Sequence, residues 1–228
     1  MRIGGLQKTS LLDFPGKVAA VVFTQGCNFL CPYCHNAELI PHRDALLAQA
    51  DVLGFLAQRR RLLEGVVISG GEPTLQEGLG GFCAVLKNLG YAIKLDTNGG
   101  RPTVVRRLLR SGLLDYVAMD VKAAPGGYPR EISLGGPGSA IGETMALLRE
   151  SGIPHEFRIP CVYPFVTEEA FGEILDVVGD APVFLQAVRL ERVSAPTFFE
   201  RKGRALREEE MQRLRQTAER RGVTCHVR

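Results

Sequence analysis

Short runs of apolar, β-branched residues alternate along the chain with longer stretches whose apolar residues recur at helical spacing. This alternation predicts six buried strands, each followed by a helix. The strands are expected at Val18–Thr24, Gly65–Ser69, Ala92–Asp96, Tyr116–Asp120, His155–Pro160 and Val183–Leu190. The helices are expected at Arg43–Arg60, Gly80–Leu89, Thr103–Ser111, Ser139–Glu150, Glu168–Val178 and Ala205–Arg221. A last short run, Val223–Val227, is expected to add an edge strand.

Six consecutive βα units predict an α/β fold with parallel strands. Such units either close part-way, as a partial (βα)6 barrel, or lie flat as a doubly wound sheet. In both arrangements ligands gather at the carboxyl ends of the strands. Because 228 residues suit one sizeable core, a single domain over residues 1–228 is expected.

Charge and composition narrow the function classes. The 28 basic and 25 acidic residues give a net charge of +3, which offers no reason to expect nucleic acid or a membrane as the main partner. The first residues lack the apolar core of a signal peptide, and no stretch approaches a membrane span. We therefore expect a cytoplasmic protein with reduced thiols, in which clustered cysteines indicate metal binding or catalysis.

Three cysteines follow the first predicted strand within eight residues, at Cys27, Cys31 and Cys34. Three thiolates are one ligand too few for a four-iron cluster or a tetrahedral zinc, so one coordination position is expected to be open to an exogenous group. The alternative is a structural zinc with His35 as fourth ligand, but adjacent residues seldom bind the same metal. The remaining cysteines, Cys83, Cys161 and Cys225, lie among apolar neighbours and are expected to be small buried side chains.

Polar or charged residues, or paired glycines, also lie at or just after the ends of the next four predicted strands. Each has a plain structural interpretation as a turn, a cap or an ion pair. Their joint placement at strand ends nevertheless favours a common site. They are Gly70, Gly71 and Glu72; Asp96 and Asn98; Asp120 and Lys122; and Arg158.

Two motifs resemble the radical S-adenosylmethionine (radical SAM) superfamily. One is the spacing Cys27-x-x-x-Cys31-x-x-Cys34 with an aromatic Tyr33, and the other is Gly70-Gly71-Glu72-Pro73. Further motifs resemble the activating enzymes of glycyl radical enzymes, above all the class that activates anaerobic ribonucleoside-triphosphate reductase. These are Asp13-Phe14-Pro15-Gly16, Gln25-Gly26-Cys27, Cys34-His35-Asn36, Leu95-Asp96-Thr97-Asn98-Gly99 and Asp120-Val121-Lys122.

The resemblance implies a partial (βα)6 barrel of the radical SAM type, with one [4Fe-4S] cluster on the three cysteines. S-adenosylmethionine would bind the unique iron and be cleaved reductively to a 5′-deoxyadenosyl radical, which takes a hydrogen atom from a backbone glycine of a large partner enzyme. A flavodoxin or ferredoxin-type protein would supply the electron. By the same resemblance, Gly70, Gly71 and Glu72 receive the methionyl ammonium and Tyr33 approaches the adenine. Asp96 and Asn98 contact the cofactor, while Asp120, Lys122 and Arg158 border the site.

Two alternatives stay open. A radical SAM enzyme acting on a small molecule or on another peptide would share every cofactor residue. A zinc-stabilised, non-catalytic binding module is the more remote alternative.

Overall fold

The computed structural model describes residues 1–42 and 44–228, which form two compact parts. The first part comprises Met1–Asn28, Glu38–Thr97 and Thr103–Val117. The second comprises Phe29–Ala37, Asn98–Pro102 and Ala118–Arg228. That residues 1–228 act as one domain stays a prediction.

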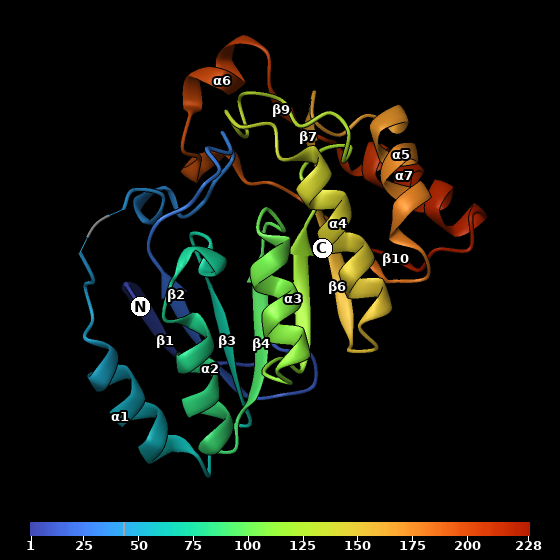
Figure 1. The fold of residues 1–228 in the computed structure, drawn as a ribbon. Helices are drawn as coiled ribbons and strands as arrows, with labels where there is room; N and C mark the ends of the chain where they lie inside the picture. Colours follow the sequence, from blue (N-terminus) through green and yellow to red (C-terminus); the bar gives the residue numbers. More distant parts are fainter. Residues whose placement is uncertain (43) are drawn as a thin grey trace. The chain divides into compact units, whose positions relative to one another are not determined.

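The first part is a mostly parallel sheet whose neighbouring strands follow chain order (Figure 1). Its strands are β1 (Ile3–Ser10), β2 (Ala19–Thr24), β3 (Gly65–Gly70) and β4 (Ala92–Thr97). β2 pairs in parallel with β3, and β3 with β4, whereas β1 runs antiparallel to β2. Its helical elements are α1 (Gln49–Arg59), α2 (Leu79–Asn88), nearly all of α3 (Pro102–Arg110), η1 (Ala37–Leu39) and η2 (Pro73–Leu75).

The core of the first part surrounds β2 and β3. Val66, Val67 and Ile68 have no exposed surface, which is the expected pattern for a parallel strand covered on both faces. Phe14 packs into the same core, and its ring centroid lies 6.1 Å from that of Tyr116. The aromatic residue of the Asp13-Phe14-Pro15-Gly16 motif therefore has a packing role.

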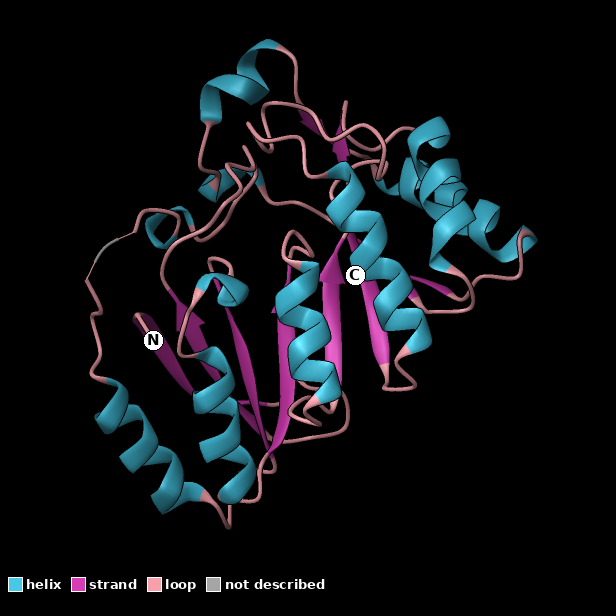
Figure 2. Ribbon diagram, in the orientation of Figure 1, coloured by secondary structure: helices cyan, strands magenta, loops and turns pink. Residues whose placement is uncertain are grey.

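The second part also contains a parallel sheet and helices (Figure 2). In strand order it includes β5 (Tyr116–Asp120) from Ala118 onward, β6 (His155–Pro160), β8 (Val183–Gln186) and β10 (Cys225–Val227). A separate antiparallel pair joins β7 (Val162–Tyr163) to β9 (Arg204–Ala205). The helical elements are α4 (Gly138–Glu150), α5 (Glu168–Val178), η3 (Leu190–Arg192), α6 (Pro196–Arg201) and α7 (Glu208–Arg220).

The predicted α/β class and all six predicted strands are confirmed, with changes at element ends. The edge strand predicted at Val223–Val227 is confirmed as β10, which pairs in parallel with β8. The strand predicted to reach Leu190 ends at Gln186 instead, and Leu190 begins η3. β1 was not predicted because Gln7, Lys8 and Thr9 are exposed and hide the alternation that marks a strand.

Two predicted helices were too long. The helix expected at Arg43–Arg60 begins at Gln49, because the amides of Leu46 and Leu47 donate to the Ile3 carbonyl of β1. Its predicted first residue, Arg43, lies outside the described residues. The helix expected at Ala205–Arg221 begins at Glu208, because Ala205 pairs in β9.

Candidate functional site

The predicted site residues divide between the two parts. Cys27, Gly70, Gly71, Glu72 and Asp96 belong to the first part. Cys31, Tyr33, Cys34, Asn98, Asp120, Lys122 and Arg158 belong to the second.

Gly70 and Gly71 lie where the end of β3 meets the end of β2. Gly70 has a φ of +110°, and a Cβ there would lie 2.4 Å from the Thr24 nitrogen. A Cβ on Gly71 would lie 2.2 Å from the Gly26 carbonyl oxygen. Because the clashing atoms belong to the backbone, only glycine fits at either position. Close packing of the chain on itself therefore explains both glycines without a ligand.

Glu72 follows directly and is fully buried. Its Oε1 accepts hydrogen bonds from the Thr74 amide at 3.1 Å, the Thr74 hydroxyl at 2.5 Å and the Thr97 hydroxyl at 2.7 Å. Its own amide donates to the Gly26 carbonyl at 2.8 Å. Glu72 thus caps η2 and joins the end of β3 to the end of β4.

Asp96 on β4 forms a buried ion pair in the first part. Its Oδ1 lies 2.5 Å from the Lys94 ammonium, and its Oδ2 accepts a hydrogen bond from the Ser69 hydroxyl at 3.0 Å. Lys94 and Asp96 are two residues apart and so lie on the same face of the strand. Sequence reasoning missed Lys94, because it occurs inside a strand pattern.

Cys27 follows β2 and is half-buried. Its amide donates to the Ile40 carbonyl at 3.0 Å, which fixes the chain where it leaves the strand.

The cysteine loop of the second part, Phe29–Ala37, contains Cys31, which is buried, and Cys34, which is half-buried. A turn bond runs from the Cys34 amide to the Cys31 carbonyl at 3.0 Å. The Leu30 amide donates to the Ile132 carbonyl at 2.8 Å, and the Phe29 ring packs on Tyr128. Contacts from residues 128–132 therefore hold the entry to the loop.

Asp120 lies between two cations. Its Oδ1 is 2.8 Å from Nε of Arg158, and its Oδ2 is 3.1 Å from the Lys122 ammonium. Burial by itself raises the pKa of Asp120, yet Arg158 and Lys122 together bring it down to about 2. Asp120, Lys122 and Arg158 thus form one ion-pair group, and their place at the border of a cofactor site stays a prediction.

Lys122 connects this ion-pair group to the cysteine loop. Its ammonium lies 6.0 Å from the centroid of the Tyr33 ring. Burial opposes its charge, but Asp120 and then Cys31 raise the pKa of Lys122 well above its usual range. Burial raises the pKa of the Cys31 thiol, while Lys122 acts in the opposite direction. The second part thus gathers Cys31, Tyr33 and Asp120 around the buried ammonium of Lys122.

The Tyr33 hydroxyl is buried without a well-formed hydrogen bond among the described residues. Burial, followed by the nearby Cys31 thiol, raises the pKa of Tyr33 well above its usual value. A buried hydroxyl beside a buried thiol fits a place where a polar group binds. A donor set of thiols also suits an iron–sulfur cluster.

Asn98 is buried in a turn, where its Oδ1 accepts a hydrogen bond from the Gly100 amide at 2.9 Å. Gly99 has a φ of +74°, its carbonyl accepts the Thr144 hydroxyl at 2.6 Å, and a Cβ there would lie 2.1 Å from the Met119 methyl carbon. Gly99, one of the two glycines that follow β4 in the sequence, thus has a packing role.

A cavity of about 280 Å³ follows β5 and β6 in the second part. Small and apolar residues dominate its lining, together with the ion pair of Lys202 and Glu131. The apolar lining residues are Ala123, Ala124, Gly127, Pro129, Pro164, Phe165 and Ala170.

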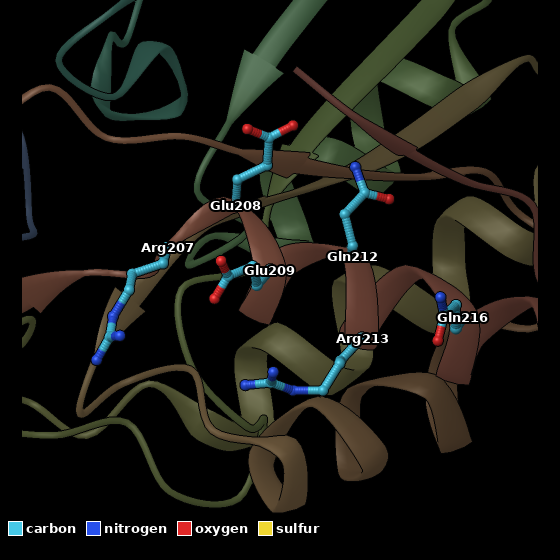
Figure 3. A pocket seen from close by; sticks show the side chains of 6 residues that line it. All are labelled: Arg207, Glu208, Glu209, Gln212, Arg213 and Gln216. Carbon is cyan, nitrogen blue, oxygen red and sulfur yellow. The ribbon is translucent and has the colours of Figure 1, made fainter.

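A second, open pocket of about 510 Å³ lies along the first turns of α7 (Figure 3). Its side chains carry charges of both signs, and none is a predicted site residue. They are Arg207, Glu208, Glu209, Gln212, Arg213 and Gln216.

Cys83, Cys161 and Cys225 are buried, as predicted. Burial raises the pKa of the first two thiols to about 12 and that of Cys225 to about 11. They therefore stay protonated and behave as small apolar side chains.

Among the described residues of either part, no group of three or more His, Cys, Asp or Glu side chains is arranged to hold a metal ion. The ligand set of Cys27, Cys31 and Cys34 stays a prediction from the sequence. No helix in the described part of the chain is long and apolar enough to cross a membrane.

Residues 21–178 match the family model of the radical SAM superfamily. The chain belongs to this superfamily. A radical SAM protein uses a [4Fe-4S] cluster and S-adenosylmethionine, so the chain is an enzyme with these cofactors.

Radical SAM relatives of several kinds are similar in sequence. A protein of Methanocaldococcus jannaschii, provisionally named a glycyl-radical enzyme activating enzyme, is 32% identical over 80% of this chain and 77% of its own length. The pyruvate formate-lyase-activating enzyme of Clostridium pasteurianum is 32% identical over 53% of this chain and 52% of its own. The 7-carboxy-7-deazaguanine synthase of Neisseria meningitidis is 32% identical over 47% of this chain and 45% of its own.

Solved radical SAM structures share the fold. SuiB of Streptococcus suis, solved with its precursor peptide SuiA, has a TM-score of 0.70 at 15% identity. The match covers 91% of this chain and 48% of SuiB. At this identity the likeness concerns the fold alone, and it agrees with the predicted radical SAM type.

We expect Gly71→Ala to destabilise the protein by about 1–3 kcal/mol, because the new methyl group would meet backbone atoms that cannot move aside. Denaturant unfolding measures the change. Gly54→Ala is the matched control, because Gly54 lies within α1 with open space around its Cβ position and alanine there should stabilise by about 0.5–1 kcal/mol. Equal stability of Gly71→Ala and the unmodified protein would contradict the packing role of Gly71.

Proposed function

We propose that the chain activates a glycyl radical enzyme by taking a hydrogen atom from a backbone glycine, and that its partner is of the anaerobic ribonucleotide reductase type. The observation that carries this proposal is the similarity to a provisionally named activating enzyme across 80% of the chain. The Asp13-Phe14-Pro15-Gly16 and Asp120-Val121-Lys122 motifs support the finer assignment of the partner.

Cys27, Cys31 and Cys34 are proposed to hold the cluster. Their spacing leaves one iron without a protein ligand, and S-adenosylmethionine would bind there. When bound, the two cofactors supply a one-electron cleavage that yields methionine and, after hydrogen transfer, 5′-deoxyadenosine. The chain's own residues bind and orient the cofactors and exclude water.

Cofactor contacts are proposed for Tyr33, Gly70, Gly71, Glu72, Asp96 and Asn98, bordered by Asp120, Lys122 and Arg158. The buried hydroxyl of Tyr33 supports its place in the site. Glu72 would serve two purposes, since its carboxylate already orders Thr74 and Thr97 and its charge suits an ammonium ligand.

The cavity of about 280 Å³ is a candidate location for the partner's glycine. Its alanine and glycine residues project little side-chain volume, so a peptide backbone can approach closely. The small size of the cavity favours a glycine over a residue with a bulky side chain.

The same proposal includes a flavodoxin or ferredoxin-type electron donor and a cytoplasmic location. It also includes the expectation that neither nucleic acid nor a membrane is a partner. They derive from the family resemblance and from composition.

Two other functions have specific observations in their favour or against them. The likeness to a 7-carboxy-7-deazaguanine synthase over 47% of the chain favours a radical SAM enzyme with a small-molecule substrate as second candidate. A zinc module would need His35 as fourth ligand, but His35 directly follows Cys34, and adjacent residues seldom bind the same metal.

Replacing any one of Cys27, Cys31 or Cys34 with alanine is expected to abolish reductive cleavage, because the cluster loses a ligand. Iron content, colour and 5′-deoxyadenosine production of anaerobically prepared protein are the measurements. Cys83→Ala is the control, since that thiol is buried and protonated, and it should keep its iron. Zinc in place of iron in the unmodified protein would support the binding module.

Glu72→Gln separates a cofactor role from a structural role. An amide oxygen still accepts the threonine hydroxyls, so we expect modest destabilisation but an affinity for S-adenosylmethionine lower by about ten- to a hundredfold, since a charge-assisted bond is lost. Calorimetric titration and thermal unfolding measure the two effects. A loss of stability with unchanged affinity would remove Glu72 from the cofactor site.

Anaerobic incubation with candidate glycyl radical enzymes tests the partner. Incubation with the correct enzyme should give a glycyl radical doublet in electron paramagnetic resonance and one 5′-deoxyadenosine per radical formed. Production of 5′-deoxyadenosine only with a small molecule, and no doublet with any candidate, would favour the second function.

A further inference from the structure

A segment outside every recognised motif lies against the cysteine loop. The Ser194 hydroxyl donates to the Cys31 carbonyl at 2.7 Å. The Ala195 amide donates to the Pro32 carbonyl at 3.0 Å. The Arg189 carbonyl oxygen lies 2.9 Å from Nε2 of His35. Residues 189–195 therefore meet the loop at three places, across 154 positions of sequence for His35 and 163 for Cys31.

The other end of the same segment is anchored independently. Phe198 stacks on Phe165 with ring centroids 5.2 Å apart and an angle of 8° between the planes. Gly203 makes room for this ring, since a Cβ there would lie 2.1 Å from it. Lys202 pairs with Glu131, although both side chains are partly exposed. Because both ends are fixed, residues 189–202 are held as a strap.

We infer that this strap positions the cysteine loop for metal binding, with Ser194 as the main positioning residue. The Cys31 carbonyl accepts two donors, the Cys34 amide and the Ser194 hydroxyl. A carbonyl oxygen has two lone pairs, so both are engaged and the peptide plane after Cys31 is fixed. The adjacent Pro32 carbonyl is held by Ala195. The strap thus orients the backbone that carries Cys31 and Cys34 through hydrogen bonds to two of its carbonyl groups.

The consequence for the cofactor rests on the proposed function, because it concerns retention of the cluster on these cysteines. A loop already held in one backbone conformation loses less conformational freedom when metal binds, so release of the metal is slower. Loss of the Ser194 hydroxyl leaves the thiols intact but loosens the peptide plane between them.

Ser194→Ala tests the inference with two readouts. In the cluster-free protein, hydrogen–deuterium exchange of peptides covering residues 29–37 should be faster by about fivefold, the equivalent of one net hydrogen bond. In the loaded protein, bleaching of the cluster by an iron chelator should accelerate by a similar factor. Ser194→Thr keeps the hydroxyl and should restore both rates.

Ser151→Ala is the matched control. The Ser151 hydroxyl donates to the Leu148 carbonyl at 2.6 Å at the end of α4, so it loses the same kind of bond without touching the loop. Its loop exchange and bleaching rates should equal those of the unmodified protein. His35→Ala, at an exposed position, is a second variant that should change both rates in the same direction as Ser194→Ala.

Different outcomes would contradict the strap and the cluster proposal. Unchanged exchange in the loop of both Ser194→Ala and His35→Ala would overturn the strap. An unmodified protein that takes up no iron would overturn the cluster proposal, while the exchange measurement would still decide whether the strap orders the loop.

Discussion

Charge buried at the ends of parallel strands must be compensated where it lies, and this requirement organises both parts of the protein. Removing one partner of a buried charge costs several kcal/mol, so the partners are fixed by folding itself. In the second part Asp120 is held between Arg158 and Lys122. In the first part Asp96 pairs with Lys94, and Glu72 is surrounded by hydroxyl and amide donors. The charged groups at these strand ends therefore have partners within the fold before any cofactor binds.

Close backbone approach is the second requirement, and it explains residues that charge does not. Gly70 and Gly71 bring the end of β3 against residues 24–26, just before Cys27. Glu72 is bonded to the same stretch through its amide. A motif that looks specific for ligand binding thus also determines how two strands end side by side. Packing and cofactor binding are compatible explanations here, because a glycine without a side chain serves both.

The fold could be predicted from the sequence wherever hydrophobic patterning was strong. All six parallel strands were found, because runs such as Val66–Ile68 are buried on both faces. β1 could not be predicted because its polar residues are exposed. The predicted helix before β3 is too long because hydrogen bonds to Ile3 override helical propensity at Leu46 and Leu47. Of the candidate site, the position of Asp120 and Lys122 at the end of β5 could be predicted. Lys94 and Tyr128 could not be, since nothing in their local sequence distinguishes them from ordinary strand and loop residues.

The cysteine loop shows why a motif alone does not define a site. Its own turn bond, from the Cys34 amide to the Cys31 carbonyl, fixes only four residues. The contacts that hold the rest come from Ile132 and from Ser194, and the second of these is 163 positions distant. Local spacing places Cys31 and Cys34 in one loop, whereas long-range hydrogen bonds fix the backbone that carries them. A short motif can therefore indicate the chemistry of such a loop. The exact arrangement of the loop depends on segments that carry no motif.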